Sequence, residues 1–212
     1  MSNVFILADF VGGKAAKTNA ELATAGARIG SVTAVVFAPV GQGSAMSAGL
    51  NAGPISNILV VESDSFSYNG VAAVADALSQ LVSTKSPAAL LIASHAYGKE
   101  VAARVAVKTE SGIITDAVDV SADITATQLV FGGSTTVHSK VSHGTPIITV
   151  RPNSIDAQVA ASTPAVETLS LQVSDASKKA TVTSSQPPVQ GGRPELTEAN
   201  IVVSGGRGTN GD

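Results

Sequence analysis

The chain has 212 residues, enough for one sizeable domain with a short appendage, and 44% of them are hydrophobic, as a self-burying core requires. Its net charge of -3 and its aromatic content of 3%, with no tryptophan, argue against nucleic acid as a partner, because such surfaces need positive charge or stacking rings. The absence of cysteine excludes disulfides, thiolate catalysis and cysteine-ligated zinc or iron–sulfur sites, so any redox chemistry needs a bound organic cofactor.

Four short apolar runs, at residues 4–8, 32–38, 58–61 and 88–93, mark the first half of the chain. Uninterrupted runs of this length are typical of strands buried on both faces of a parallel sheet. They begin about 30 residues apart, which is the length of a strand–helix–strand unit. The first run follows no basic leader and is too short to span a membrane, so we expect a cytoplasmic protein with no direct membrane insertion.

Helix signals lie between these runs. Residues 18–21 match a capping box, in which the Thr18 hydroxyl accepts from a free backbone amide and Glu21 reaches back to the cap. Apolar residues recur at helical spacing over residues 71–82, and a third helix is expected from about residue 97 to residue 108. The alternation of strands and helices predicts an α/β fold of three layers, with a doubly wound, mainly parallel sheet.

The pattern changes after residue 116. Residues 125–131, 135–141 and 146–150 resemble strands joined by short turns at Gly132-Gly133 and His143-Gly144, which predicts an antiparallel extension of the parallel sheet. Alternating apolar residues near Leu169, Leu171 and Val173 indicate one further edge strand.

The last part of the chain predicts a domain boundary. Residues 184–192 have the composition of a linker, and residues 199–204 resemble a new strand. A lone strand cannot form a domain, so we expect a domain over residues 1–190 and, over residues 191–212, a linker and the short stub of a second domain that is cut off.

Several segments are candidate ligand sites with simpler structural interpretations. Residues 41–46 begin like a dinucleotide-binding loop but lack its third glycine, which favours a plain strand–helix turn. His138 and His143 flank a predicted turn without a third metal ligand, so we interpret them as surface residues. His95 follows the fourth apolar run, and its suitability as a general base depends on position alone. Residues 94–100, which include Lys99, fit either an anion site or a capped turn in which Gly98 permits a tight reversal.

Ser204, Gly205, Gly206, Arg207 and Gly208 form the most informative segment. Glycines let backbone amides approach a ligand closely, and an arginine can pair with a phosphate or lie against a planar ring. Its place after a linker and an expected strand makes a ligand-binding loop and a plain tail about equally good interpretations.

Residues 193–208 closely resemble the junction between the amino-terminal domain and the flavin domain of electron transfer flavoprotein α subunits. Residues 98–106 and 113–118 resemble the central region of that family, and residues 131–133 and 145–152 resemble its hairpin region. The resemblance extends over essentially the whole chain, although members of the family continue for about another hundred residues.

The resemblance implies a heterodimer with an electron transfer flavoprotein β subunit. One FAD then carries electrons from acyl-CoA and related dehydrogenases to a membrane quinone reductase, so the full-length protein is an electron carrier and not an enzyme. Arg207, in the loop Ser204 to Gly208, matches a FAD contact of the family and would stabilise reduced flavin. Because most flavin contacts of the family lie in the missing domain, the chain is expected to act as a scaffold and to purify without FAD.

Two alternatives stay open. One is a free-standing adenine-nucleotide-binding module, with its ligand at the strand ends near Ser94 and His95. The other is an enzyme that uses His95 and Lys99 on a substrate that the sequence does not identify.

Overall fold

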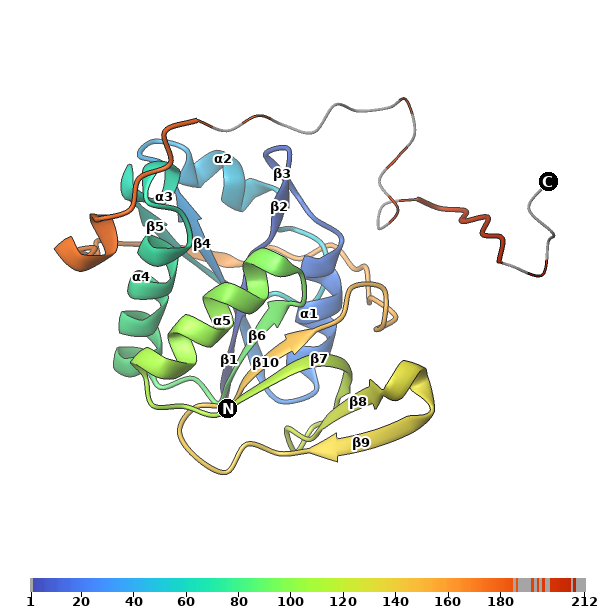
Figure 1. Cartoon of the computed structure of the whole chain (residues 1–212). Helices are drawn as coiled ribbons and strands as arrows, with labels where there is room; N and C mark the ends of the chain where they lie inside the picture. The colour runs from blue at the N-terminus through green and yellow to red at the C-terminus, as the bar shows by residue number, and fades with distance from the viewer. Residues whose placement is uncertain are drawn as a thin grey trace.

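Nine strands form one sheet within the part of the chain that the structure describes, in the order β11-β5-β4-β1-β6-β10-β7-β8-β9 (Figure 1). The structure is a computed structural model that describes residues 2–184, 186, 192, 194, 196, 199–206 and 208. The strands of the sheet are β1 (Asn3–Leu7), β4 (Ser31–Ala38), β5 (Asn57–Glu62), β6 (Ala89–Ala93), β7 (Ile113–Val120), β8 (Ala126–Val130), β9 (Thr135–Ser139), β10 (Ile147–Val150) and β11 (Ala165–Leu169).

The four apolar runs of the first half are the parallel strands β1, β4, β5 and β6, as predicted. Alternate residues of β1 face opposite sides of the sheet: Val4 and Ile6 belong to one hydrophobic cluster, and Phe5 and Leu7 to the other. Both sides of the strand are therefore buried, which explains its uninterrupted apolar sequence.

The predicted role of residues 146–150 is wrong in one respect. They form β10, which pairs in parallel with β6 and β7 inside the sheet and is not part of the antiparallel extension. All four residues of β10 are buried, so this apolar run has the same cause as the earlier ones. His143-Gly144 accordingly lies in a connection between β9 and β10, strands that are not neighbours, and is not a hairpin turn.

The antiparallel extension itself is confirmed. It consists of β8 and β9, which pair with each other and add to β7, a strand that the sequence analysis did not foresee. The expected edge strand is also present, as β11, which pairs in parallel with β5 at the opposite edge of the sheet.

Helices cover both faces of the sheet, which confirms the three-layer, doubly wound fold (Figure 1). Helix α1 (Thr18–Ala27) packs in the hydrophobic cluster on one face, and α4 (Gly70–Lys85) and α5 (Ala96–Lys108) pack in the cluster on the other. Shorter elements at the carboxyl edge were not predicted: the β2–β3 hairpin (Phe10–Val11 and Lys14–Ala15), α2 (Gly43–Ala48) and α3 (Ser65–Tyr68). Among the described residues, no helix is both long and apolar enough to cross a bilayer. The cytoplasmic location stays a prediction.

The capping box expected at residues 18–21 is not formed. The residue at the cap position of α1 is Lys17, whose side chain makes no capping hydrogen bond. The Thr18 hydroxyl instead donates to Asp9 Oδ2 (2.9 Å), and Glu21 Oε2 accepts from the backbone amide of Asn153 (2.9 Å). Both side chains serve tertiary contacts that a local motif cannot reveal.

The strand expected at residues 199–204 is likewise not formed. The described residues 199–206 have no strand, and the side chains of Ile201 and Val203 are 82% and 92% exposed. The division of the chain into a domain over residues 1–190 and a stub over residues 191–212 stays a prediction.

Candidate functional site

The sheet has a switch point between β1 and β6, which are neighbours. Helix α1 follows β1 on one face of the sheet, whereas α5 follows β6 on the other. The loops after the two strands therefore leave in opposite directions, and in open α/β sheets this is where a ligand crevice forms. Asp9 comes two residues after the end of β1, and His95 comes two residues after the end of β6.

Asp9 and His95 join across this point. His95 Nε2 lies 3.2 Å from Asp9 Oδ2, and the two side chains are 37% and 16% exposed. The other ring nitrogen, Nδ1, accepts from the Gly98 amide (3.1 Å), which makes His95 the amino-terminal cap of α5. An accepting Nδ1 places the ring hydrogen on Nε2, where it is donated to Asp9.

The surroundings shift the pKa values of both Asp9 and His95. Burial alone would raise the pKa of Asp9, but the hydrogen bond and charge of His95, with the Thr18 hydroxyl and the Phe10 amide, hold it below its ordinary value. The hydrogen bond to Asp9 raises the pKa of His95, against the opposing effect of burial. A second proton on His95 must go to Nδ1, where it displaces the Gly98 amide, so charging His95 competes with capping α5.

Substituting His95 tests both contacts. His95→Ala should lower the free energy of unfolding by about 2 kcal/mol, because it removes the cap and one of the three hydrogen bonds to the Asp9 carboxylate. His95→Asn should cost about half as much, since asparagine is a good capping residue but cannot supply the contact to Asp9. Urea unfolding measures both, with exposed His138→Ala as the control. Equal losses for the two variants would show that the cap contributes nothing.

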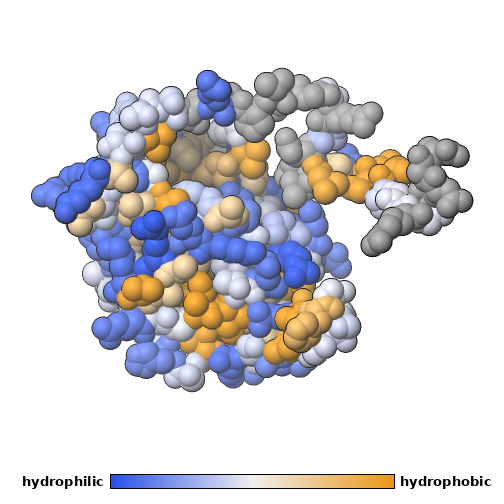
Figure 2. Space-filling model, in the orientation of Figure 1, coloured by the Kyte–Doolittle hydropathy of each residue, from blue (hydrophilic) through white to orange (hydrophobic). Residues whose placement is uncertain are grey.

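A cavity of about 340 Å³ opens beside this pair. Four aromatic side chains line it, contributed by four different segments: Phe10, Phe37, Phe66 and Tyr97. The rings of Phe37 and Phe66 pack with centroids 5.0 Å apart and tilted by 59°. Figure 2 shows the surface hollowed here, with apolar colouring in the hollow between α2 and the beginning of α5. Aromatic walls with a few convergent polar groups are typical of small-molecule sites.

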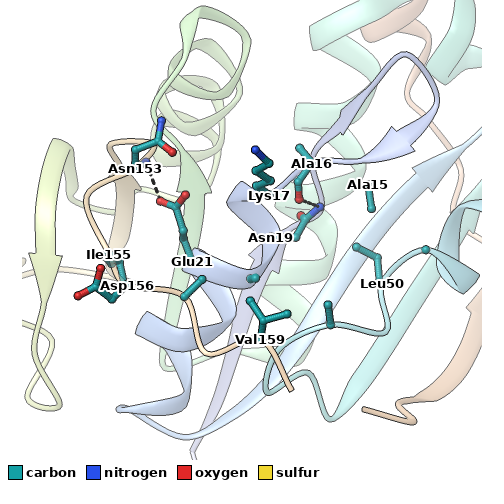
Figure 3. A pocket seen from close by; sticks show the side chains of 14 residues that line it. Ala15, Ala16, Lys17, Asn19, Glu21, Leu50, Asn153, Ile155, Asp156 and Val159 are labelled. Atoms are coloured by element: carbon teal, nitrogen blue, oxygen red, sulfur yellow. Dashed lines mark hydrogen bonds between the residues drawn. The ribbon is translucent and has the colours of Figure 1, made fainter. Parts of the chain in front are cut away.

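A larger cavity, of about 520 Å³, lies on the α1 side (Figure 3). Its walls are mostly small or aliphatic, with Leu50, Ile155 and Val159 among them, and it contains no aromatic ring. Lys17 and Glu21 lie at the beginning of α1, and Figure 3 shows Glu21 directed at the backbone of Asn153.

A narrower space of about 110 Å³ adjoins both cavities. It shares Asp9 and His95 with the aromatic cavity, and Lys17 and Glu21 with the larger one. Asp9 and His95 therefore line two of these three adjoining spaces, which we together call the groove.

A second polar cluster lies at the ends of β6 and β10. Asp116 Oδ1 accepts from the Ser94 hydroxyl (2.7 Å), and Asp116 Oδ2 accepts from Lys99 Nζ (3.0 Å). The backbone amide of Asp116 donates to the hydroxyl of buried Thr149 (3.0 Å). Burial alone would raise the pKa of Asp116, but the bonds from Ser94 and Lys99 lower it. Asp116 has a φ of 59°, so these bonds hold a left-handed residue at the irregular pairing of β7 and β10.

Comparison with known proteins identifies the family. Residues 4–184 match the electron transfer flavoprotein domain. The chain belongs to the electron transfer flavoprotein family. It is 37% identical to the electron transfer flavoprotein subunit alpha of Mycobacterium leprae, over 98% of this chain and 65% of the relative. It is 39% identical to the protein of the same name in Mycobacterium tuberculosis strain H37Rv, over 85% of the chain and 56% of the relative. With that of Syntrophomonas wolfei it shares 33% identity, over 100% of the chain and 67% of the relative.

These findings confirm the resemblance to electron transfer flavoprotein α subunits that residues 193–208 and the central motifs indicate. The chain spans about two thirds or less of the length of these three relatives. What whole electron transfer flavoproteins do is therefore a matter of proposal for this chain.

The segment that resembles the family's FAD contact is only partly described. Arg207 lies outside the described residues. Ser204, Gly205, Gly206 and Gly208 are exposed, and they line none of the three spaces above. These four residues do not by themselves enclose a flavin, so their predicted role in cofactor binding stays a prediction.

The other candidate residues of this family member have structural explanations. Gly41 has a φ of +81°, and a Cβ at Gly43 would lie 2.4 Å from a side-chain carbon of Val60, so the glycines of residues 41–46 serve a turn and a close approach. The Gly43 amide donates to Glu62 Oε1 (2.7 Å), so this amide is already bonded to a carboxylate of the chain itself. Gly98 does not have the left-handed backbone expected of a tight reversal; its lack of a side chain matters because a Cβ would lie 2.0 Å from the Ala93 carbonyl oxygen.

The predicted surface positions of His138 and His143 are confirmed, since both are exposed. Within the residues searched, no group of three or more histidine or acidic side chains could hold a metal ion. His95 and Lys99, paired in the enzyme hypothesis, instead contact different carboxylates, Asp9 and Asp116.

Asp9, which lines the groove, was not among the residues predicted from the sequence. The available signal was positional: a carboxylate follows the first buried strand and an imidazole follows the fourth, both where parallel strands end.

Proposed function

We propose that this chain supplies the amino-terminal α/β scaffold domain of an electron transfer flavoprotein α subunit. In the complete complex, FAD carries electrons from acyl-CoA-type dehydrogenases to a membrane quinone reductase. The family match over residues 4–184, with relatives named as α subunits, is the observation that carries the proposal. The protein is then an electron carrier and not an enzyme that converts a substrate.

The role of the described domain in this proposal is structural. Its two hydrophobic clusters join helices to both faces of the sheet, and a rigid domain of this kind can position a partner subunit. We assign that partner as the electron transfer flavoprotein β subunit, since the relatives are named as one subunit of an assembly. Ser204 to Gly208, with Arg207, are the residues of this chain that we propose to approach the FAD. Because the described residues among them lie exposed and form no enclosed site, no redox step is assigned to them.

Co-purification with a cognate β subunit tests the scaffold role. We expect a one-to-one complex by size-exclusion chromatography that is colourless in the visible range, because no enclosed flavin site is described in this chain. Each chain run alone gives the reference elution volumes. Unchanged elution of the mixture would overturn the docking role, and a yellow chain that retains FAD by itself would overturn the assignment of the flavin site elsewhere.

The alternative of an adenine-nucleotide-binding module has one observation in its favour, the aromatic cavity at the switch point. It is compatible with the scaffold role, because the two proposals concern different properties of the same domain.

A further inference from the structure

We propose that the aromatic cavity between the ends of β1 and β6 binds a planar nitrogen heterocycle of nucleobase size, with Asp9 as its hydrogen-bond acceptor. The cavity measures about 340 Å³, at the lower end of the range usual for small-molecule sites. It lies at the switch point of the sheet, where loops diverge and side chains leave space.

The walls determine the shape of the ligand. Phe37 comes from β4, Phe66 from α3, Tyr97 from α5 and Phe10 from β2, so rings from four elements surround one space. Planar rings stack on such walls whatever their substituents, which is how bases bind to aromatic side chains. A flexible aliphatic ligand would gain less from the same walls.

Asp9 determines the polarity of the ligand. A carboxylate offers about four lone-pair sites. Three are taken by the Nε2 of His95, the hydroxyl of Thr18 and the amide of Phe10. One acceptor position of the carboxylate is left, and Asp9 lines the cavity together with the aromatic side chains. An exocyclic amino group such as that of adenine is a matching donor.

Charge argues against recognition through phosphate. In its hydrogen-bonded tautomer His95 is neutral, so the pair with Asp9 carries one negative charge. The adjoining space adds Glu21 and Lys17, whose charges oppose each other. A phosphate therefore meets no net positive field, and the ring must supply the affinity.

The larger cavity is the weaker candidate in spite of its size. Its lining of small, aliphatic and polar side chains contains no aromatic ring on which a planar ligand could stack. Glu21, its most deeply buried carboxylate, already accepts from the Asn153 amide.

Calorimetric titration of the full chain with adenosine tests the proposal. We expect saturable one-to-one binding, with a dissociation constant on the order of 1 mM or tighter. AMP should bind within about threefold of adenosine, because the phosphate finds no partner charge. No saturable binding of adenosine would overturn the proposal, and so would binding of AMP alone, which would indicate a phosphate site.

Two pairs of variants locate the ligand. Ala8 lines the aromatic cavity, so Ala8→Leu should fill it and weaken adenosine binding at least tenfold, whereas Ala103→Leu on the exposed face of α5 should not. Phe66→Leu should weaken binding several-fold by removing one wall, whereas Tyr68→Leu on the same short helix, outside the lining, should not. Circular dichroism confirms that each variant is folded, and the Phe66 pair keeps the test valid should Ala8→Leu fail to fold.

Wild-type affinity in both folded cavity variants would overturn the proposal. The test is independent of the subunit role, because it uses this chain alone. Failure to bind adenosine leaves the β-subunit experiment unaffected, and failure to bind the β subunit leaves the titration unaffected.

Discussion

Gly98→Ala is expected to destabilise the domain by about 3 kcal/mol, the upper part of the range for overpacking a close-packed interior. A Cβ at this position would lie 2.0 Å from the Ala93 carbonyl oxygen and 3.1 Å from a side-chain carbon of Ile92. The nearest atom is backbone of the central strand β6, so no side chain can turn aside. The beginning of α5 must move instead, which breaks the bond from the Gly98 amide to His95. Urea unfolding followed by circular dichroism measures the loss.

Gly49→Ala is the matched control. Gly49 ends α2 with a φ of -75°, and an added Cβ would lie 3.4 Å from the Cβ of Ala15, an ordinary contact. This variant should stay within about 1 kcal/mol of the wild type, or gain slightly from the lower entropy of its unfolded chain. Equal stability of the two variants would mean that the close approach of Gly98 to the Ala93 carbonyl oxygen does not affect the free energy of unfolding.

The parallel core could be predicted from the sequence because burial on both faces leaves a local signature. Continuous apolar runs at β1 and β6 need no knowledge of their neighbours to be interpreted as buried strands. Strand order has no such signature. Residues 146–150 have the same composition as the other core strands, yet nothing local shows that they insert between β6 and β7.

The predictions made from polar motifs were wrong for a related reason: the partners of these side chains are distant in the sequence. Thr18 and Glu21 have the spacing of a capping box, but Asp9 and Asn153 compete for the same side chains and are brought close only by the fold. The pair of Asp9 and His95 joins residues 86 positions apart, so its existence depends on β1 and β6 being neighbours. Sequence therefore identified His95 by its place after a strand but could not supply its partner.

Asp76→Asn is expected to have the second large effect, about 2 kcal/mol at neutral pH, the usual range for hydrogen bonds to a charged group. Asp76 is a buried carboxylate on α4. It accepts from Lys108 Nζ on α5 (2.9 Å) and from the backbone amide of Ser174 (2.8 Å), so it ties two helices to the segment after β11. Asparagine keeps the shape of the side chain but loses the charge, which leaves Lys108 without its partner.

The pH dependence of this effect has a definite sign. Burial alone would raise the pKa of Asp76, but the bonds from Lys108 and Ser174 outweigh it and lower the pKa below the ordinary 3.8. A carboxylate whose native pKa lies below its unfolded value stabilises the fold above the unfolded pKa, and that contribution is lost as the pH falls through the native pKa. The stability difference between wild type and Asp76→Asn should thus be constant down to about pH 5 and shrink towards zero below about pH 4.

Urea midpoints measured from neutral to acid pH test this dependence, with Asp64→Asn as the control. Asp64 is exposed, and its carboxylate makes no ion pair among the described residues, so its replacement should have little effect at any pH. A difference for Asp76→Asn that stays constant into acid would show that the shape of the side chain, and not its charge, holds the helices. A shrinking difference would identify the ion pair of buried Asp76 with Lys108 as one cause of acid sensitivity in the domain, separate from the groove at the switch point.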